Sequence, residues 1–169
     1  MELVAPHLIV VLGLPGTGKT TFARALADHL GALHLNTDML RAQMGLRGRY
    51  DEATKARIYE ALLQQGRAGL VAGRRVVLDG TFYKEAFRDR LAELAREAGA
   101  GVKWLEITAS PETVRQRVSR HRPYSEADFA VYQKIRGAYE PLRGERLSLA
   151  SDHLTPEAML NRALQFLGL

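Results

Sequence analysis

Eight residues near the start of the chain, Gly13 to Thr20, have types and spacing suited to binding phosphate. They read Gly-Leu-Pro-Gly-Thr-Gly-Lys-Thr and match the P-loop pattern G-x-x-x-x-G-K-[ST] at every fixed position. In such a loop the glycines let successive backbone N–H groups point at one spot, and the N-terminus of the next helix adds partial positive charge. Lys19 would reach the β- and γ-phosphates, and the Thr20 hydroxyl would ligate Mg²⁺.

The residues on either side of the motif place it where this chemistry needs it. An apolar, β-branched run at residues 8–12 is typical of a buried parallel strand. The Ala- and Leu-rich residues 21–30 predict a helix that stops at Gly31. The motif therefore predicts a nucleoside triphosphate site. We expect ATP to be bound by nine consecutive residues: Gly13, Leu14, Pro15, Gly16, Thr17, Gly18, Lys19, Thr20 and Thr21.

An acidic and a basic residue follow the second expected strand, residues 32–36. Phosphoryl transfer needs an aligned acceptor hydroxyl, a group that takes its proton and cations over the transferring phosphate. Asp38 suits the proton acceptor, and Arg41 suits holding an anionic group of the acceptor. The alternative is that Asp38 merely caps a helix that begins at Met39.

Asp79 ends the apolar run at residues 76–78, which predicts a third strand. A carboxylate at a strand end beside a P-loop is well placed to hold Mg²⁺. Thr81, two residues further on, could help through its hydroxyl. The alternative for Asp79 is a cap of the helix expected to begin near Tyr83.

The densest basic cluster follows the fourth expected strand and consists of Arg115, Arg117, Arg120, His121 and Arg122. On a helix, Arg117 and Arg120 lie on one face. One interpretation is a lid, at about residues 115–127, that closes arginines over the transferring phosphoryl group and excludes water. The other is a solvated helix face.

Residues 40–73 form a polar, largely helical segment on the expected acceptor side of the site. Tyr50, Lys55, Arg57 and Tyr59 could line an acceptor pocket, or the tyrosines could pack at helix edges. The histidines have no metal-ligand spacing, and this set is His7, His29, His34 and His153.

Strand-like and helical patterns alternate along the whole chain, which predicts an α/β fold with a parallel sheet flanked by helices. Two further strands are expected at residues 102–107 and near 147–149. Further helices are expected at residues 51–72, 84–98, 111–120, 125–140 and 156–167, the fourth from its Ser-x-x-Asp start signal.

Composition is that of an ordinary globular domain. The 169 residues are 46% hydrophobic and 25% charged, and we expect residues 1–169 to form a single domain. No apolar run is long enough to span a bilayer and there is no basic-then-apolar leader, so a cytoplasmic location is expected. The absence of cysteine excludes disulfides and a thiol nucleophile. A net charge of +5 favours anionic ligands.

Taken together, these motifs resemble the small P-loop kinases related to the 5′-kinase domain of phage polynucleotide kinase, gluconate kinase and the zeta-toxin-type kinases. The sequence is most similar to predicted bacterial kinases of the AAA-like P-loop class. The matching stretches are residues 13–20, 36–41 and 76–82, Arg117 with Arg120, and residues 125–128 followed by Tyr132 and Glu140-Pro141. The resemblance implies a five-stranded parallel sheet and a lid after the fourth strand. It also implies that Asp38 supplies the base and that the Asp38-x-x-Arg41 pair binds the acceptor end.

Three functions remain open at this point. The first is an ATP- and Mg²⁺-dependent kinase that phosphorylates a hydroxyl of a small molecule. The second is a polynucleotide 5′-hydroxyl kinase, with nucleic acid as the acceptor, and the third is a nucleotide-dependent regulatory ATPase module. For the kinase we expect no membrane association and no obligate protein partner. The catalytic candidates are Lys19, Asp38, Arg41, Arg117 and Arg120, and the metal candidates are Thr20 and Asp79.

Overall fold

The computed structural model describes residues 8–120 and 128–169. Its centre is a five-stranded sheet in which every neighbouring pair of strands is parallel, in the order β2-β3-β1-β4-β5. The expected five-stranded parallel sheet is confirmed. The strands are β1 (Leu8–Leu12), β2 (Leu33–Asn36), β3 (Val76–Gly80), β4 (Val102–Thr108) and β5 (Leu147–Ala150).

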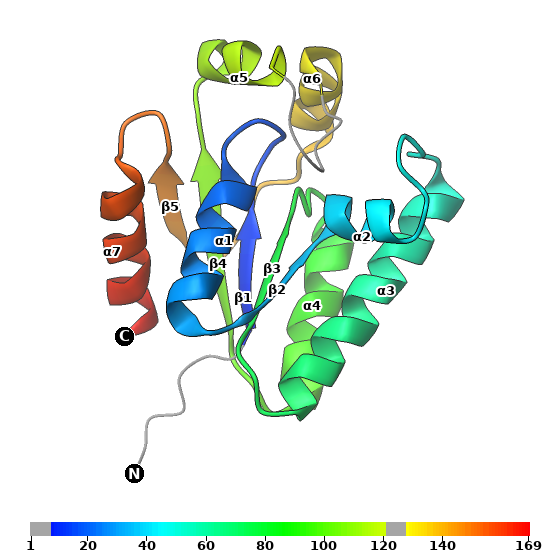
Figure 1. Cartoon of the computed structure of the whole chain (residues 1–169), viewed down its shortest axis with the longest axis vertical. Helices are drawn as coiled ribbons and strands as arrows, with labels where there is room; N and C mark the ends of the chain where they lie inside the picture. The colour runs from blue at the N-terminus through cyan, green and yellow to red at the C-terminus, as the bar shows by residue number, and fades with distance from the viewer. Residues whose placement is uncertain (1–7, 121–127) are drawn as a thin grey trace.

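Helices cover both faces of the sheet and its upper edge (Figure 1). Helices α1 and α7 lie on one side and α3 and α4 on the other, while α5 and α6 lie above the ends of the strands. Among the described residues, no helix has the length and apolar character needed to cross a membrane. The helices are α1 (Lys19–Leu30), α2 (Thr37–Gln43), α3 (Glu52–Val71), α4 (Glu85–Glu97), α5 (Pro111–Val118), α6 (Phe129–Ala138) and α7 (Pro156–Leu167).

Strand β1 is buried along its whole length because both faces of the sheet are covered. Successive side chains of a strand point to opposite faces. Val10 therefore packs in the cluster with α3 and α4, whereas Ile9 and Val11 pack in the cluster with α1 and α7. The central strand thus contributes to two hydrophobic cores, and the loop that follows it starts from the fully buried centre of the sheet.

The helix expected from Ser125 begins later in the structure. Asp128 has an extended backbone and accepts a hydrogen bond from the Val131 backbone N–H at 2.9 Å, so it is the N-cap of α6. The helix starts at Phe129, and the predicted start is wrong because an aspartate three residues beyond the serine is itself a good cap. Ser125 lies outside the described residues.

Two glycines of α3 test how closely this helix approaches the sheet. A Cβ added to Gly69 would lie 2.8 Å from Val76 Cγ2 and 3.0 Å from Leu33 Cδ2, whereas one on Gly66 would lie 3.8 Å from Leu78 Cδ2. We predict that Gly66→Ala raises the free energy of unfolding by up to about 1 kcal/mol through helix propensity. Gly69→Ala should lower it by about 1–3 kcal/mol through overpacking.

The measurement is urea denaturation of both variants beside the wild-type protein. The two substitutions make the same chemical change in the same helix, so each is the control for the other. Equal stabilisation by both would contradict the close packing of α3 on β2 and β3.

Candidate active site

The loop between β1 and α1 has the backbone that its glycines predict. Gly16 and Gly18 have φ of +81° and +94°, in the left-handed region that glycine adopts without strain. A Cβ on Gly16 would also lie 2.8 Å from the side chains of Val114 and Val118 in α5. Gly18 is the N-cap of α1, and no side chain in the described part of the chain caps this helix. The first amide groups of α1 therefore remain available to an anion.

Two side chains of the loop fold back onto its own backbone. The Thr17 hydroxyl donates to the Leu14 carbonyl at 2.8 Å, and the Lys19 ammonium lies 3.4 Å from the same carbonyl oxygen. Lys19 also lines the cavity described below. Its charge is therefore held over the loop, where a phosphate group would lie.

A buried carboxylate connects the loop to two strands of the sheet. Asp79, at the end of β3, is fully buried. Its Oδ1 accepts a hydrogen bond from the Thr20 hydroxyl at 3.0 Å, and its Oδ2 lies 2.7 Å from His34 Nε2. Asn36 Nδ2 donates to the Thr20 oxygen at 3.1 Å.

The alternative of Asp79 as a helix cap is wrong, because α4 begins at Glu85 with Lys84 as its N-cap.

The contact between His34 and Asp79 was not expected from the sequence. His34 lies 45 residues from Asp79 along the chain, and only the register of β2 on β3 brings the two together. The presence of polar residues at alternate positions of a buried strand, His34 and Asn36, is the signal that could have indicated it.

Asp38 and Arg41 form a close pair on α2. Arg41 Nη1 donates to Asp38 Oδ1 at 2.7 Å, and Arg41 Nε donates to the Arg49 carbonyl at 3.2 Å. The guanidinium also lies 4.4 Å from the centre of the Tyr50 ring, and Arg41 is buried.

The capping alternative for Asp38 is wrong, because Asn36 accepts the hydrogen bond from the Met39 N–H and is the N-cap.

A cavity of about 430 Å³ lies beside the P-loop. It lies between the P-loop, the first turns of α1, the ends of β2 and β5, and the starts of α2 and α7. Its size is within the range of small-molecule sites. The expected site residues that line it are Gly16, Gly18, Lys19, Thr20, Thr21, Asp38 and Arg117, whereas Arg41 and Asp79 do not line it.

Among the arginines of the expected lid, Arg117 contacts the P-loop. Its Nη1 donates to the Thr17 carbonyl at 3.1 Å and to Ser151 Oγ at 2.9 Å.

The other basic residues of this cluster lie elsewhere. The Arg115 guanidinium lies 4.4 Å from the centre of the Phe129 ring and so connects α5 with α6. Arg120 is exposed. His121 and Arg122 lie outside the described residues.

Ser151 is a second site residue that the sequence did not indicate. Its hydroxyl donates to the Thr17 carbonyl at 2.5 Å while accepting from Arg117. Ser151 follows the last strand and lies 134 residues from Thr17 along the chain. It braces the P-loop backbone from the side opposite to β3.

The residues expected on the acceptor side are mostly engaged in packing or ion pairs. The Tyr59 ring stacks on Phe87 with ring centres 4.2 Å apart, and burial raises the pKa of Tyr59 to about 12. Its phenol is therefore neutral at physiological pH and is no candidate for the base. Lys55 lies 3.6 Å from Glu52, and Arg57 is exposed.

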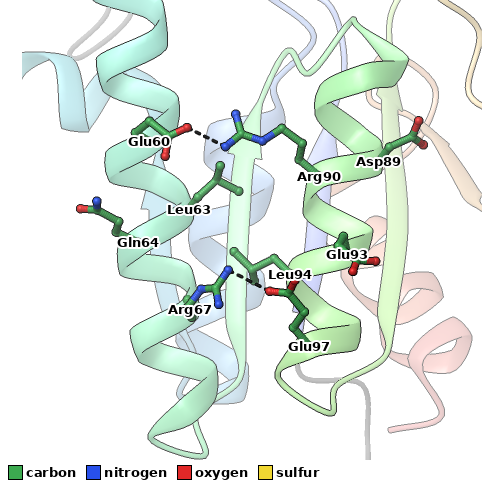
Figure 2. A pocket seen from close by; sticks show the side chains of 9 residues that line it. All are labelled: Glu60, Leu63, Gln64, Arg67, Asp89, Arg90, Glu93, Leu94 and Glu97. Carbon is green, nitrogen blue, oxygen red and sulfur yellow. Dashed lines mark hydrogen bonds and ion pairs between the residues drawn. The ribbon is translucent and has the colours of Figure 1, made fainter.

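A second cavity, of about 520 Å³, lies between α3 and α4. Figure 2 shows Arg90 reaching across to Glu60 and Arg67 reaching across to Glu97, at N···O distances of 2.6 Å and 3.0 Å. These charges pair with each other across the groove and have no glycine loop beside them. The cavity of about 430 Å³ beside the P-loop is therefore the candidate active site.

The donor groups at this site suit Mg²⁺. The described residues contain no group of three His, Cys, Asp or Glu side chains that could hold a metal ion. Mg²⁺ in phosphate-binding sites needs fewer protein ligands, because water and phosphate oxygens complete its octahedron. The Thr20 hydroxyl and the Asp79 carboxylate supply hard oxygen donors next to the P-loop, which fits this mode of binding.

Comparison with known proteins places the chain beside other P-loop proteins. A family model described as "AAA domain" matches residues 8–142. The uncharacterized protein Rv2004c of Mycobacterium tuberculosis is 29% identical over 124 residues, which are 66% of this chain and 25% of that protein. The chain thus spans about a quarter of the length of the curated relatives it matches.

Solved structures share the whole fold at low sequence identity. A gluconokinase from Sinorhizobium meliloti 1021 superposes with a TM-score of 0.74 at 21% identity, over 97% of this chain and 93% of that one. The APS kinase CysC of Mycobacterium tuberculosis, in complex with AMPPNP and APS, gives 0.73 at 16% identity, over 98% and 99% of the two chains.

Proposed function

The chain belongs to the AAA domain family, and we propose that it is an ATP-dependent kinase which transfers the γ-phosphoryl group to a hydroxyl of a small molecule. One observation carries the proposal. The Asp38 carboxylate lines the same cavity as Lys19 and Thr20 of the P-loop. A carboxylate in this position can take the proton of an acceptor hydroxyl, which a site that only binds nucleotide does not require.

In this proposal the P-loop amides and Lys19 hold the phosphates of ATP. Thr20 and Asp79 would hold Mg²⁺, which would supply positive charge to offset that of the phosphates. The residues then only have to align the acceptor with the γ-phosphate, because phosphoryl transfer needs little covalent help from the protein. A nucleotide analogue bound to a kinase of the same fold supports this use of the site.

Asp38 accepts the proton of the acceptor hydroxyl as its oxygen attacks the γ-phosphorus, and the bond from this phosphorus to the β–γ bridging oxygen breaks so that ADP leaves. Arg41 orients the Asp38 carboxylate through their 2.7 Å hydrogen bond. Its remaining N–H groups are those we expected to hold an anionic group of the acceptor. Arg117 and Arg120, on α5 and just after it, belong to the expected lid and stabilise the charge of the transferring group.

The basic charge of the chain and the Asp38-x-x-Arg41 pair keep a polynucleotide 5′-hydroxyl as the second candidate acceptor. The test is a screen with γ-labelled ATP against nucleosides, sugars, sugar acids, aminoglycosides and 5′-hydroxyl oligonucleotides. Label transfer to one small-molecule class supports the proposal, and transfer to oligonucleotides alone supports the second candidate. ATP hydrolysis without transfer to any acceptor would favour a regulatory ATPase.

We predict that Asp38→Asn lowers kcat by about 10²-fold or more, because the amide cannot accept the acceptor's proton. Affinity for ATP should change little. The measurement is steady-state transfer with the acceptor found in the screen, beside nucleotide binding by calorimetry. Asp28→Asn, at an exposed position of α1, is the control. A collapse of ATP affinity with an unchanged kcat would assign Asp38 to structure or metal binding instead.

For the lid, Arg117→Ala and Arg120→Ala should each slow transfer by about 10²- to 10³-fold, because their contacts strengthen as charge develops. Loss of ATP affinity should be smaller, and hydrolysis should rise relative to transfer as water enters. Both products are measured in the same reaction. The control is Arg96→Ala, an exposed arginine of α4 that pairs with Glu93. Variants that match this control in both products would show that these arginines do not act on the transferring phosphoryl group.

A further inference from the structure

We propose that His34 is a positioning residue that fixes the Asp79 carboxylate, and through it the Thr20 hydroxyl, in the orientation needed for Mg²⁺-dependent nucleotide binding. The proposal rests on the proposed function, in which Thr20 and Asp79 hold the metal ion. It adds a residue from a third element, β2, that touches neither the nucleotide nor the metal.

The register of the sheet brings the two side chains together. His34 lies opposite Val77, and Asn36 lies opposite Asp79, in the parallel pair β2 and β3. Side chains two residues apart on a strand share a face, and Val77 packs in the cluster with α1. His34, Asn36 and Asp79 therefore all face α1, which carries Thr20.

The hydrogen bonds at this point leave little freedom to the carboxylate. Asp79 is fully buried, and a buried charge is costly unless each oxygen has a donor. Thr20 supplies the donor for Oδ1. His34 Nε2, 2.7 Å from Oδ2 and with its side chain 12% exposed, supplies the other.

The same bonds fix the Thr20 hydroxyl. Its proton is donated to Asp79, and one lone pair accepts from Asn36 Nδ2. A hydroxyl has two lone pairs, so one remains for a cation. If the carboxylate turned, the Thr20 proton would follow it and that lone pair would change direction.

Without the imidazole, Oδ2 would be left without its donor, and the carboxylate would turn toward another one. Partners that orient metal-binding groups in this way typically contribute about 10- to 100-fold in metal affinity. A residue that only fills space would instead contribute to fold stability, equally with and without metal. The two roles therefore differ in a measurable quantity.

The experiment measures binding of AMPPNP to the full chain by calorimetry, once with saturating Mg²⁺ and once with EDTA. The dissociation constant with EDTA divided by that with Mg²⁺ reports how strongly Mg²⁺ supports nucleotide binding, and we call this quotient the ratio. We expect His34→Ala to lower this ratio by about 10-fold or more while the EDTA value stays near wild type. His34→Gln should restore most of the ratio, because its amide N–H can reach Oδ2. His29→Ala, at an exposed histidine of α1, should leave the ratio unchanged.

A double-mutant comparison tests whether His34 acts through Asp79. If it does, the ratio for His34→Ala combined with Asp79→Asn will equal that for Asp79→Asn alone. Effects that multiply would overturn the proposal. So would a lower melting temperature for His34→Ala with an unchanged ratio, which is the result for a purely structural side chain.

Failure of the proposed function gives a different result. If the wild-type ratio is near one, or Asp79→Asn leaves it unchanged, the metal role of the site is wrong and the His34 proposal falls with it. If Asp79→Asn lowers the ratio and His34→Ala does not, only the role of His34 is overturned. A readout that needs no metal is ¹⁵N NMR of the imidazole. It should show a proton on His34 Nε2, and Asp79→Asn should shift the Nε2 signal. An Nε2 without a proton would also contradict the proposal.

Discussion

The site depends on one constraint, which is that a carboxylate removed from water must find its donors within the protein. Asp79 is fully buried at the end of β3 and obtains them from Thr20 at the start of α1 and His34 in β2. These bonds fix the P-loop helix and two strand ends relative to one another. The phosphate-binding loop is therefore held by the polar interior of the protein as well as by its two hydrophobic cores.

On the side of the cavity lined by Asp38, an ion pair plays a similar part. Arg41 is held between the Asp38 carboxylate, the Arg49 carbonyl and the Tyr50 ring. On the opposite side, Arg117 and Ser151 contact the Thr17 carbonyl of the P-loop. Charged side chains from elements far apart in sequence are thus preorganised around one cavity, which is what phosphoryl transfer requires of a protein.

Most of the fold could be predicted from the sequence because the patterns that specify it are local. The P-loop between an apolar strand and a helix, and a carboxylate at the end of β3, both follow from neighbouring residues. Helix α2 is indicated in the sequence only by the possible cap before Met39, because seven residues carry little periodic signal. The contacts of His34 and Ser151 span 45 and 134 residues and depend on strand register and sheet order, which no local pattern encodes.

If the P-loop of this chain binds the phosphates of ATP, the affinity for ATP must depend on the P-loop lysine, and equilibrium binding measures this affinity. Binding of ATP and Mg²⁺ would be measured by calorimetry for the wild-type protein and Lys19→Ala, with Lys134→Ala, at an exposed lysine of α6, as the control. Lys19→Ala should weaken ATP binding by about 10- to 100-fold, as expected for a lost charge-assisted contact. The control should bind ATP as the wild-type protein does. Equal affinity of Lys19→Ala and wild type would contradict it.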